Sequence, residues 1–302
     1  MNGKMKKAAI LLSTWNGEKY LPQQIESLLA QNWTDLVICV RDDGSSDGTP
    51  ALLERRRGDP RFRITLGENL GFAKSFLTLL RENGGADCYF FCDQDDVWLP
   101  DKVSRCAAAL EQVDPARPAL CFTGREICSE DLKRLGPAPM PSNIGFLNAL
   151  ADCVPMGCCM AFNAAARDLA AEHLPEHCCG HDWWLYLLCA AFGEVIPLQE
   201  SGILYRRHEG NVSAGGMGFL RFQLWRFRKF FLGGYFTEIT AMLREFEAVY
   251  GPRLTEEQRG QLSLFTRRRA ADQWKKLTYP RPFRQSAADE IFLRLCFLLG
   301  RL

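Results

Sequence analysis

Three carboxylates stand at the end of an apolar run, in the segment CYFFCDQDDVW, and could hold a metal ion. The run 88–92 is typical of a buried strand, and Asp93, Asp95 and Asp96 follow it directly. Carboxylate oxygens are hard ligands for Mg²⁺ or Mn²⁺, often shared with the phosphates of a nucleotide. The alternative is a solvated acidic turn in front of the helix that begins near Pro100. On these residues alone the two interpretations have equal weight.

Two other predicted strands also end in polar clusters. The motif STWNG follows the first strand and RDDGSSD follows the second. The carboxylates of Asp42 and Asp43 can accept hydrogen bonds from a base or a ribose, and Thr14 and Asn16 can contact the nucleoside from the neighbouring strand. Such residues also populate ordinary turns. Three clusters at one edge of a sheet favour a binding site over three unrelated turns.

The first part of the chain alternates between strand and helix periodicity. We expect strands at 8–12, 36–40, 62–66 and 88–92, with helices at 18–30, 48–57 and 72–81 between them. This alternation predicts an α/β fold with a mostly parallel sheet flanked by helices, and ligands at the carboxyl ends of the strands. Between Glu130 and Pro155 the pattern is lost among prolines and glycines, which we interpret as one long functional loop.

Two later segments also carry reactive side chains. Asp182 precedes an apolar helical stretch in HDWWLYLLCAAFG, which places a carboxylate at a helix N-terminus. The segment YRRHEGN combines a ring, two guanidinium groups and the imidazole of His208, which suits a diphosphate and its metal, although a charged surface turn explains it equally well. A third set consists of histidines and cysteines, residue types that can bind zinc: His173, His177, Cys178, Cys179 and His181. Their spacing does not match the two ligand pairs of a structural zinc site, so we expect these residues to lie at helix ends and in the core.

The 302 residues have the composition of a soluble globular protein, but their charge is uneven. The formal net charge is +1, whereas residues 214–302 contain 16 Lys and Arg against 8 Asp and Glu, so this part carries +8 and the remainder −7. The thirteen cysteines lie largely in apolar runs and no secretory signal opens the chain, so we expect reduced core thiols in a cytoplasmic protein. No apolar run reaches the length of about 20 residues that a spanning helix needs.

Six motifs, taken in order, resemble those of the family 2 glycosyltransferases of GT-A fold, closest to the rhamnosyltransferase-like branch. They are LLSTWNGEKYLPQQIESLLAQ, VRDDGSSDGT, ENLGFAKSF, FFCDQDDVWLPDKV, HDWWLYLLCAAFG and LYRRHEGN. The resemblance covers about residues 8–214. It implies a GT-A nucleotide-sugar-binding catalytic domain over residues 1–213. The resemblance covers the rest only loosely, and from their composition we expect residues 214–302 to form a basic, aromatic-rich helical region.

The resemblance also implies roles for individual residues. Asp93 and Asp95 match the two ends of the DxD motif, and with His208 they would hold Mg²⁺ or Mn²⁺, Asp95 being the direct ligand. Asp182 matches the general base. The nucleoside and its diphosphate would be bound by Ser13, Thr14, Asn16, Asp42, Asp43, Lys74, Asp93 and Arg206.

Two further positions bear on the acceptor. Asp96 is expected to orient the loop of the acidic tetrad, Asp93-Gln94-Asp95-Asp96, or to face the acceptor. Cys158-Cys159, in MGCCMAFN, stand where relatives often carry a hydroxyl residue, and this departure leaves the acceptor-side contacts open.

The implied activity is inverting transfer of a sugar to a glycan or lipid-linked acceptor in cell-surface polysaccharide synthesis. The donor would be a dTDP- or UDP-sugar, with dTDP-rhamnose preferred and a UDP-hexose as the alternative. A nucleotidyltransferase would need a glycine-rich, basic phosphate loop, and STWNGEKY offers only Gly17 and Lys19. A non-catalytic nucleotide-sugar-binding module would not need the base and the metal ligands.

The basic C-terminal region has two interpretations of equal weight. Its segment 219–231, FLRFQLWRFRKFF, interleaves aromatic and cationic residues and could lie on an anionic membrane, at the inner face of the cell membrane. Alternatively, its apolar face packs on the catalytic domain or on a second subunit. We expect no nucleic-acid partner, because the chain is nearly neutral and lacks a nucleic-acid-binding motif.

Overall fold

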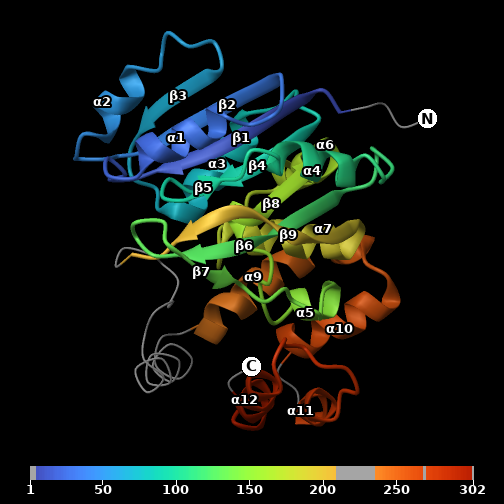
Figure 1. The fold of residues 1–302 in the computed structure, drawn as a ribbon. Helices are drawn as coiled ribbons and strands as arrows, with labels where there is room; N and C mark the ends of the chain where they lie inside the picture. The colour runs from blue at the N-terminus through green and yellow to red at the C-terminus, as the bar shows by residue number, and fades with distance from the viewer. Residues whose placement is uncertain (1–4, 209–234, 268–269, 301–302) are drawn as a thin grey trace. The chain divides into compact units, whose positions relative to one another are not determined.

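The computed structural model describes residues 5–208, 235–267 and 270–300, which form two compact units (Figure 1). The first unit comprises residues 5–140, 155–174 and 192–208. The second comprises residues 141–154, 175–191 and the described residues after 234. The predicted domain boundary at residue 213 lies outside the described residues and stays a prediction. Two segments that precede it belong to the second unit.

A single sheet forms the centre of the first unit, and its described strands run in the order β3-β2-β1-β4-β8-β6-β9-β5. Four neighbouring strands are parallel: β3 (Phe62–Gly67), β2 (Asp35–Asp43), β1 (Lys7–Thr14) and β4 (Cys88–Cys92). The next strand, β8 (Met160–Asn163), is antiparallel to β4 and to β6 (Ala119–Cys128), and β9 (Glu194–Arg206) is parallel to β6. Two short strands, β5 (Val97–Trp98) and β7 (Arg134–Pro137), pair antiparallel with β9 and β6. The predicted α/β class with a mostly parallel sheet is confirmed.

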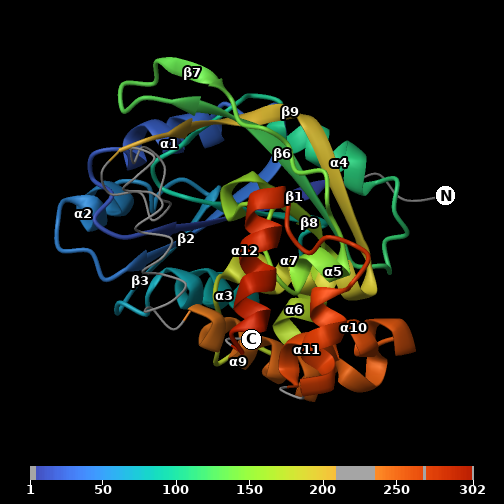
Figure 2. The same ribbon diagram turned by 90° about the horizontal axis from the view of Figure 1, so that it is seen from below.

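Helices cover both faces of this sheet. One face carries α1 (Leu21–Leu29) and α4 (Lys102–Leu110), and the other carries α3 (Phe72–Glu82) and α6 (Ala164–Glu172), as Figure 2 shows. Between β2 and β3 lies α2 (Thr49–Glu54), and the short η1 (Gly157–Cys159) leads into β8. Because the sheet is covered on both sides, its central strands contain continuous apolar runs, and every residue of β4 is buried. Ten of the thirteen cysteines are buried, as expected of core side chains.

The described part of the second unit is helical. Its elements are α5 (Phe146–Ala149), α7 (His181–Phe192), α9 (Tyr235–Tyr250), η3 (Gly251–Arg253), α10 (Glu256–Thr266), α11 (Ala270–Leu277) and α12 (Ala287–Leu298). The indole of Trp184 in α7 packs against Phe246 and Tyr250 of α9, with ring centroids 5.9 and 6.1 Å apart. A capping box between Thr255 and Gln258 starts α10. No described helix is long and apolar enough to cross a membrane.

The long loop or connection predicted between Glu130 and Pro155 contains two short elements that its sequence does not indicate. This stretch contains β7 and the single turn α5. Neither element has a periodic pattern long enough to be recognised in the sequence, because both depend on tertiary partners. The strand β7 pairs with β6, and the side-chain amide of Asn148 in α5 donates a 2.7 Å hydrogen bond to the carbonyl oxygen of Phe283.

Candidate active site

The sheet register brings the polar ends of β1, β2 and β4 to one edge of the first unit. Thr14 pairs with Asp42 across β1 and β2, and Leu12 pairs with Cys92 across β1 and β4. Asp93 therefore continues β4 beside the end of β1. The strands β1 and β2 extend beyond their predicted apolar cores, so that Thr14, Asp42 and their neighbours are held in strand geometry. The gathering of three polar clusters at one edge agrees with the expectation for a parallel sheet.

Gln94, the uncharged member of the tetrad, holds the end of β1 in place by hydrogen bonds. Its side-chain oxygen accepts hydrogen bonds from the Thr14 hydroxyl (2.6 Å) and from the Trp15 backbone N–H (2.8 Å). Its amide nitrogen donates to the Trp15 carbonyl at 3.0 Å. A Cβ at Gly17 would overlap this amide, so the close approach requires glycine there. This role of Gln94 was not predicted from the sequence, although its position between the carboxylates of the tetrad could have indicated that it contacts the site.

Asn16 and Asp42 join the two loops that follow β1 and β2. Asn16 has φ 49°, a left-handed conformation that asparagine tolerates better than most residues. Its backbone N–H donates to the Ser45 hydroxyl (2.8 Å), and its side-chain oxygen accepts from the Ser46 backbone N–H (2.8 Å). Asp42 accepts from the N–H and the hydroxyl of Ser45, at 2.9 and 2.5 Å. The predicted nucleoside set is thus a preformed, hydrogen-bonded edge.

Asp43 is as deeply buried as Asp42, with 3% and 2% of their surfaces exposed. Its carboxylate is ion-paired with Arg41 and accepts hydrogen bonds from the backbone N–H groups of Leu70 and Gly71, both at 2.9 Å. These contacts fix the entry to α3, where the predicted diphosphate residue Lys74 lies exposed on the first turn.

The remaining residue of the predicted set on β1 faces α3. The Ser13 hydroxyl hydrogen-bonds to that of Ser75 at 2.7 Å. Ser13 thus connects the strand to the helix that carries Lys74.

His208 and Asp95 form a close pair at the same edge. The imidazole Nε2 of His208 lies 2.8 Å from Asp95 Oδ2, and both side chains keep some exposure, 11% and 18%. The ring of Tyr20 lies against the imidazole with 4.6 Å between centroids, and its hydroxyl donates to Glu130 at 2.7 Å. Tyr20 and Glu130 were missed because 110 residues separate them and no local spacing connects them.

The pair has the donors and the separation expected of two ligands on one cation. Oxygen ligands bind Mg²⁺ at about 2.1 Å, so neighbouring ligands of an octahedral ion lie about 3 Å apart. The 2.8 Å between Asp95 Oδ2 and His208 Nε2 fits that arrangement. Carboxylate and imidazole together also suit Mn²⁺. The residues present therefore fit the metal that the sequence predicts.

Arg206, predicted to face the diphosphate, is 4% exposed, and its donors point into the protein. Its Nε donates to the Asp95 carbonyl (2.8 Å), one terminal nitrogen to the Gln23 side chain (2.6 Å) and the other to the Glu130 carbonyl. Its backbone N–H donates to Asp96 Oδ1 at 3.1 Å. The guanidinium therefore ties the tetrad to α1 and to the chain around Glu130.

Buried polar residues of α1 and of the turn that follows it hold the tetrad loop from the other side. Gln24, which is fully buried, donates to the Asp93 carbonyl at 2.9 Å, and Ser27 accepts from the Trp98 N–H at 3.0 Å. Gln31 donates to the Leu99 carbonyl at 2.9 Å. Each bond satisfies a loop backbone group that would otherwise be buried unpaired. The tetrad is consequently fixed at both of its ends.

Asp182, the predicted base, belongs to the second unit. It occupies the first turn of α7, where a carboxylate interacts favourably with the helix dipole. Its Oδ1 accepts a 2.8 Å hydrogen bond from the backbone N–H of Trp183. The neighbouring His181 is 4% exposed, and burial lowers the pKa of its imidazole to about 4, although Asp182 acts in the opposite direction.

Comparison with known proteins defines the class. The model of the glycosyl transferase family 2 matches residues 9–174, more than half of the chain, so the chain belongs to this family. An uncharacterized glycosyltransferase of Nostoc sp. is 31% identical over 220 residues, which span 68% of this chain and 66% of that protein. The dTDP-rhamnosyl transferase RfbG of Shigella flexneri is 22% identical over 69% of this chain and 75% of its own length.

Solved structures support the fold. S. aureus TarS 1–349 in complex with UDP has a TM-score of 0.61 at 16% identity, covering 90% of this chain and 75% of that one. The same protein with UDP-GlcNAc has a TM-score of 0.58 at 15% identity, covering 97% of this chain and 92% of that one. The predicted GT-A-like fold with C-terminal helices is thereby confirmed.

Proposed function

We propose that this glycosyltransferase moves a sugar, with inversion, from a nucleoside diphosphate donor to an acceptor hydroxyl in a reaction assisted by Mg²⁺ or Mn²⁺. The observation that carries the proposal is the Asp95–His208 pair, 2.8 Å apart, on the sheet edge that also carries Thr14, Asn16 and Asp42. Hard ligands beside a hydrogen-bonding edge suit a diphosphate attached to a nucleoside. Lys74, exposed on the first turn of α3, adds a positive charge for that diphosphate.

The proposed mechanism needs one base. Asp182 accepts the proton of the acceptor hydroxyl as that oxygen attacks the anomeric carbon, and the nucleoside diphosphate leaves from the opposite face. Asp95 and His208, with Asp93 nearby in the loop, would hold the cation, which supplies a Lewis acid for the leaving diphosphate. Arg206 is a positioning residue in this scheme, because its guanidinium donates to the Asp95 carbonyl, the Gln23 side chain and the Glu130 carbonyl.

The preferred donor is dTDP-rhamnose, and a UDP-hexose is the second candidate. The likeness to RfbG, named as a dTDP-rhamnosyl transferase, favours the first, and the UDP complexes of TarS favour the second. The proposed acceptor is a glycan or a lipid-linked saccharide of cell-surface polysaccharide synthesis. The reaction would take place on the cytoplasmic side of the cell membrane.

Contact with an anionic membrane is part of this proposal, and α12 supports it. Its inner residues Leu293, Cys296 and Phe297 are buried, yet its outer face is also apolar. Exposed fractions there are 62% for Ile291, 48% for Leu295, 59% for Leu298 and 63% for Leu299. In α11, Trp274 is 70% exposed beside the exposed Lys275, a pairing suited to an anionic interface. The predicted membrane segment 219–231 itself lies outside the described residues.

The test is a thermal-shift panel of dTDP-rhamnose, UDP-galactose, UDP-glucose and UDP-N-acetylglucosamine, each with and without Mn²⁺. We expect one donor to raise the melting temperature in a Mn²⁺-dependent manner, because a ligand that binds the folded state stabilises it. Stabilisation by no donor under any condition contradicts the proposal. Product analysis then separates a glycosyltransferase, which releases a nucleoside diphosphate, from a nucleotidyltransferase, which releases pyrophosphate.

A further inference from the structure

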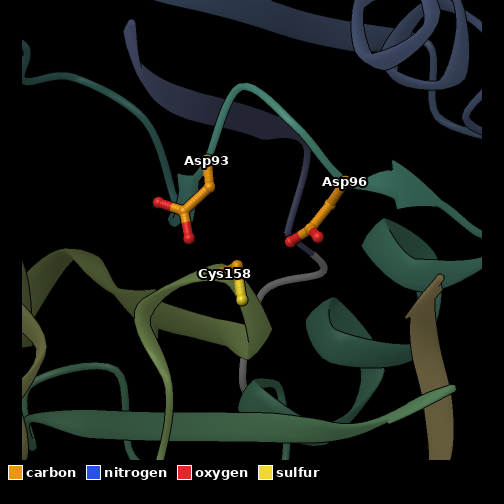
Figure 3. Close-up of side chains that lie close together, drawn as sticks. All are labelled: Asp93, Asp96 and Cys158. Carbon is orange, nitrogen blue, oxygen red and sulfur yellow. The ribbon is translucent and has the colours of Figure 1, made fainter. Parts of the chain in front are cut away.

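A second group of metal-capable side chains lies beside the Asp95–His208 pair. Asp93 and Asp96 stand on the two arms of the turn after β4, and Cys158 approaches from η1 (Figure 3). One ligand atom from each of the three lies within 4.8 Å of the others. Asp96 and Cys158 are buried, whereas Asp93 is half-buried and so gives the group a side open to solvent.

Asp96 has a carboxylate oxygen that the described protein leaves without a partner. The residue is fully buried, and while Oδ1 accepts from the Arg206 N–H, Oδ2 has no hydrogen bond. A buried carboxylate oxygen without a donor is costly, because nothing replaces the water it has lost. A cation beside Oδ2 would relieve this cost.

The nearest buried cation in the sequence, Lys102, is engaged elsewhere. Its ammonium donates to the Cys158 carbonyl at 2.6 Å and lies over the Trp98 ring at 3.4 Å from the centroid. This contact also fixes the backbone of η1, and with it the position of the Cys158 thiol. The thiol is thus held in place next to two carboxylates.

We propose that Asp96 and Cys158, with Asp93 as a carboxylate shared with the first centre, form a second cation site, which takes a thiophilic divalent ion such as Zn²⁺ or Cd²⁺. Thiolate sulfur and carboxylate oxygen bind zinc at about 2.3 and 2.0–2.2 Å, so ligand atoms of one tetrahedral ion lie about 3.3–3.7 Å apart. Atoms that already lie within 4.8 Å of one another reach that spacing by an approach of about 1 Å, through side-chain rotation. Sulfur distinguishes this site from the oxygen and nitrogen ligands of Asp95 and His208, because soft ligands select soft ions.

The experiment is a Cd²⁺ titration of the full-length protein, followed by the ultraviolet charge-transfer band of cadmium thiolate. It is done in a Cys153→Ser/Cys178→Ser/Cys179→Ser background, which removes the three half-exposed thiols that could bind cadmium themselves. We expect the thiolate band to saturate at one Cd²⁺ per chain, since a Cd²⁺ ion on Asp95 and His208 has no sulfur ligand and gives no such band. Cys158→Ser should abolish the band, and Asp96→Asn should weaken binding by about 10-fold or more. The matched control is Cys296→Ser, which removes a buried thiol of α12.

A titration that is unchanged in Cys158→Ser or in Asp96→Asn overturns the proposal. So does the absence of any cadmium–thiolate band. Should the variants fail to fold, cadmium NMR of the background protein decides the matter, because sulfur ligation and all-oxygen ligation give well-separated shifts. The readout is cation binding, so the outcome is independent of whether the chain transfers a sugar.

Discussion

His208 Nε2 contacts Asp95 Oδ2 at 2.8 Å across 113 residues of sequence. The contact joins the end of β9 to the loop after β4, and Tyr20 of the first loop stacks on the imidazole. The proposed metal centre therefore exists as a preformed pair before any donor is bound. Preformed ligands lose little conformational entropy when the ion arrives.

Removing either member of this pair should abolish metal-dependent donor binding. For Asp95→Ala and for His208→Ala we expect Mn²⁺ affinity, measured by calorimetry, to fall by about 100-fold or more, since few ligands remain. Asp131→Ala, which removes an exposed carboxylate of the same unit, is the control and should bind as the wild type does. Unchanged Mn²⁺ affinity in Asp95→Ala would exclude Asp95 as a ligand.

Arg206→Lys tests the positioning role of the guanidinium. A lysine cannot reach the Asp95 carbonyl, the Glu130 carbonyl and the Gln23 side chain together, because it has one nitrogen. We expect Mn²⁺ binding to weaken by roughly 10- to 100-fold, as for groups that orient metal ligands, together with a lower melting temperature. Arg207→Lys, at the next residue, is the control. If Arg206→Lys loses donor affinity but keeps Mn²⁺ affinity, the guanidinium binds the diphosphate instead.

Asp182→Asn separates binding from catalysis. A missing general base typically costs roughly 10²–10⁴-fold in rate, while donor affinity should stay within a factor of about two. The measurements are a single-turnover transfer assay and donor titration by thermal shift. Glu238→Gln changes an exposed carboxylate in the first turn of another helix, α9, and should leave both quantities unchanged. Near wild-type turnover in Asp182→Asn would remove it from the role of base.

The buried His181 should make the stability of the protein dependent on pH. Its pKa is about 4 in the folded state and about 6.5 in an unfolded chain. Between these values the unfolded state binds more protons, so the free energy of unfolding falls as the pH drops from about 6.5 towards 4. The loss is at most about 1.4 kcal/mol per pH unit. Urea unfolding of His181→Phe should show a shallower pH dependence than the wild type, and an equal slope would contradict the prediction.

The apolar outer face of α12 should govern membrane binding. We expect Leu295→Ser/Leu298→Ser to lose co-sedimentation with anionic vesicles, because each exposed leucine contributes apolar area at the interface. Leu70→Ser/Leu135→Ser replaces two exposed leucines of the first unit and serves as the control. Pelleting that is equal for both double variants, or equal with neutral vesicles, favours packing against another protein surface.

The fold was largely predictable because the parallel strands are continuous apolar runs. The segments that became β1 to β4 were recognised by this pattern, with ends displaced by a few residues. The short antiparallel strands β5 and β7 were not recognised, because β5 has only two residues and the apolar and polar residues of β7 alternate weakly. Such strands form where a partner offers an edge, and the partner lies far away in sequence.

The candidate site, like the fold, was only partly predictable from the sequence. The acidic and hydroxyl residues were visible as clusters after strands, whereas the partners of those residues were not. The Asp43 carboxylate is ion-paired with Arg41 and accepts hydrogen bonds from two backbone N–H groups. The guanidinium of Arg206 donates a hydrogen bond to the Asp95 carbonyl in the tetrad loop. Residue type indicates what a side chain can bind, but which partner it has depends on tertiary contacts.

The chain changes unit after Met140, Val154, Leu174, Ala191 and His208, and this interleaving has a consequence for biosynthesis. Trp184 leaves the ribosome well before Phe246 and Tyr250, the rings on which it packs. The apolar face of α7 therefore stays uncovered until the C-terminal helices have been made, a period in which a chaperone could bind it. A gene shortened after residue 213 would make that exposure permanent, and its product should aggregate instead of yielding a separate catalytic domain.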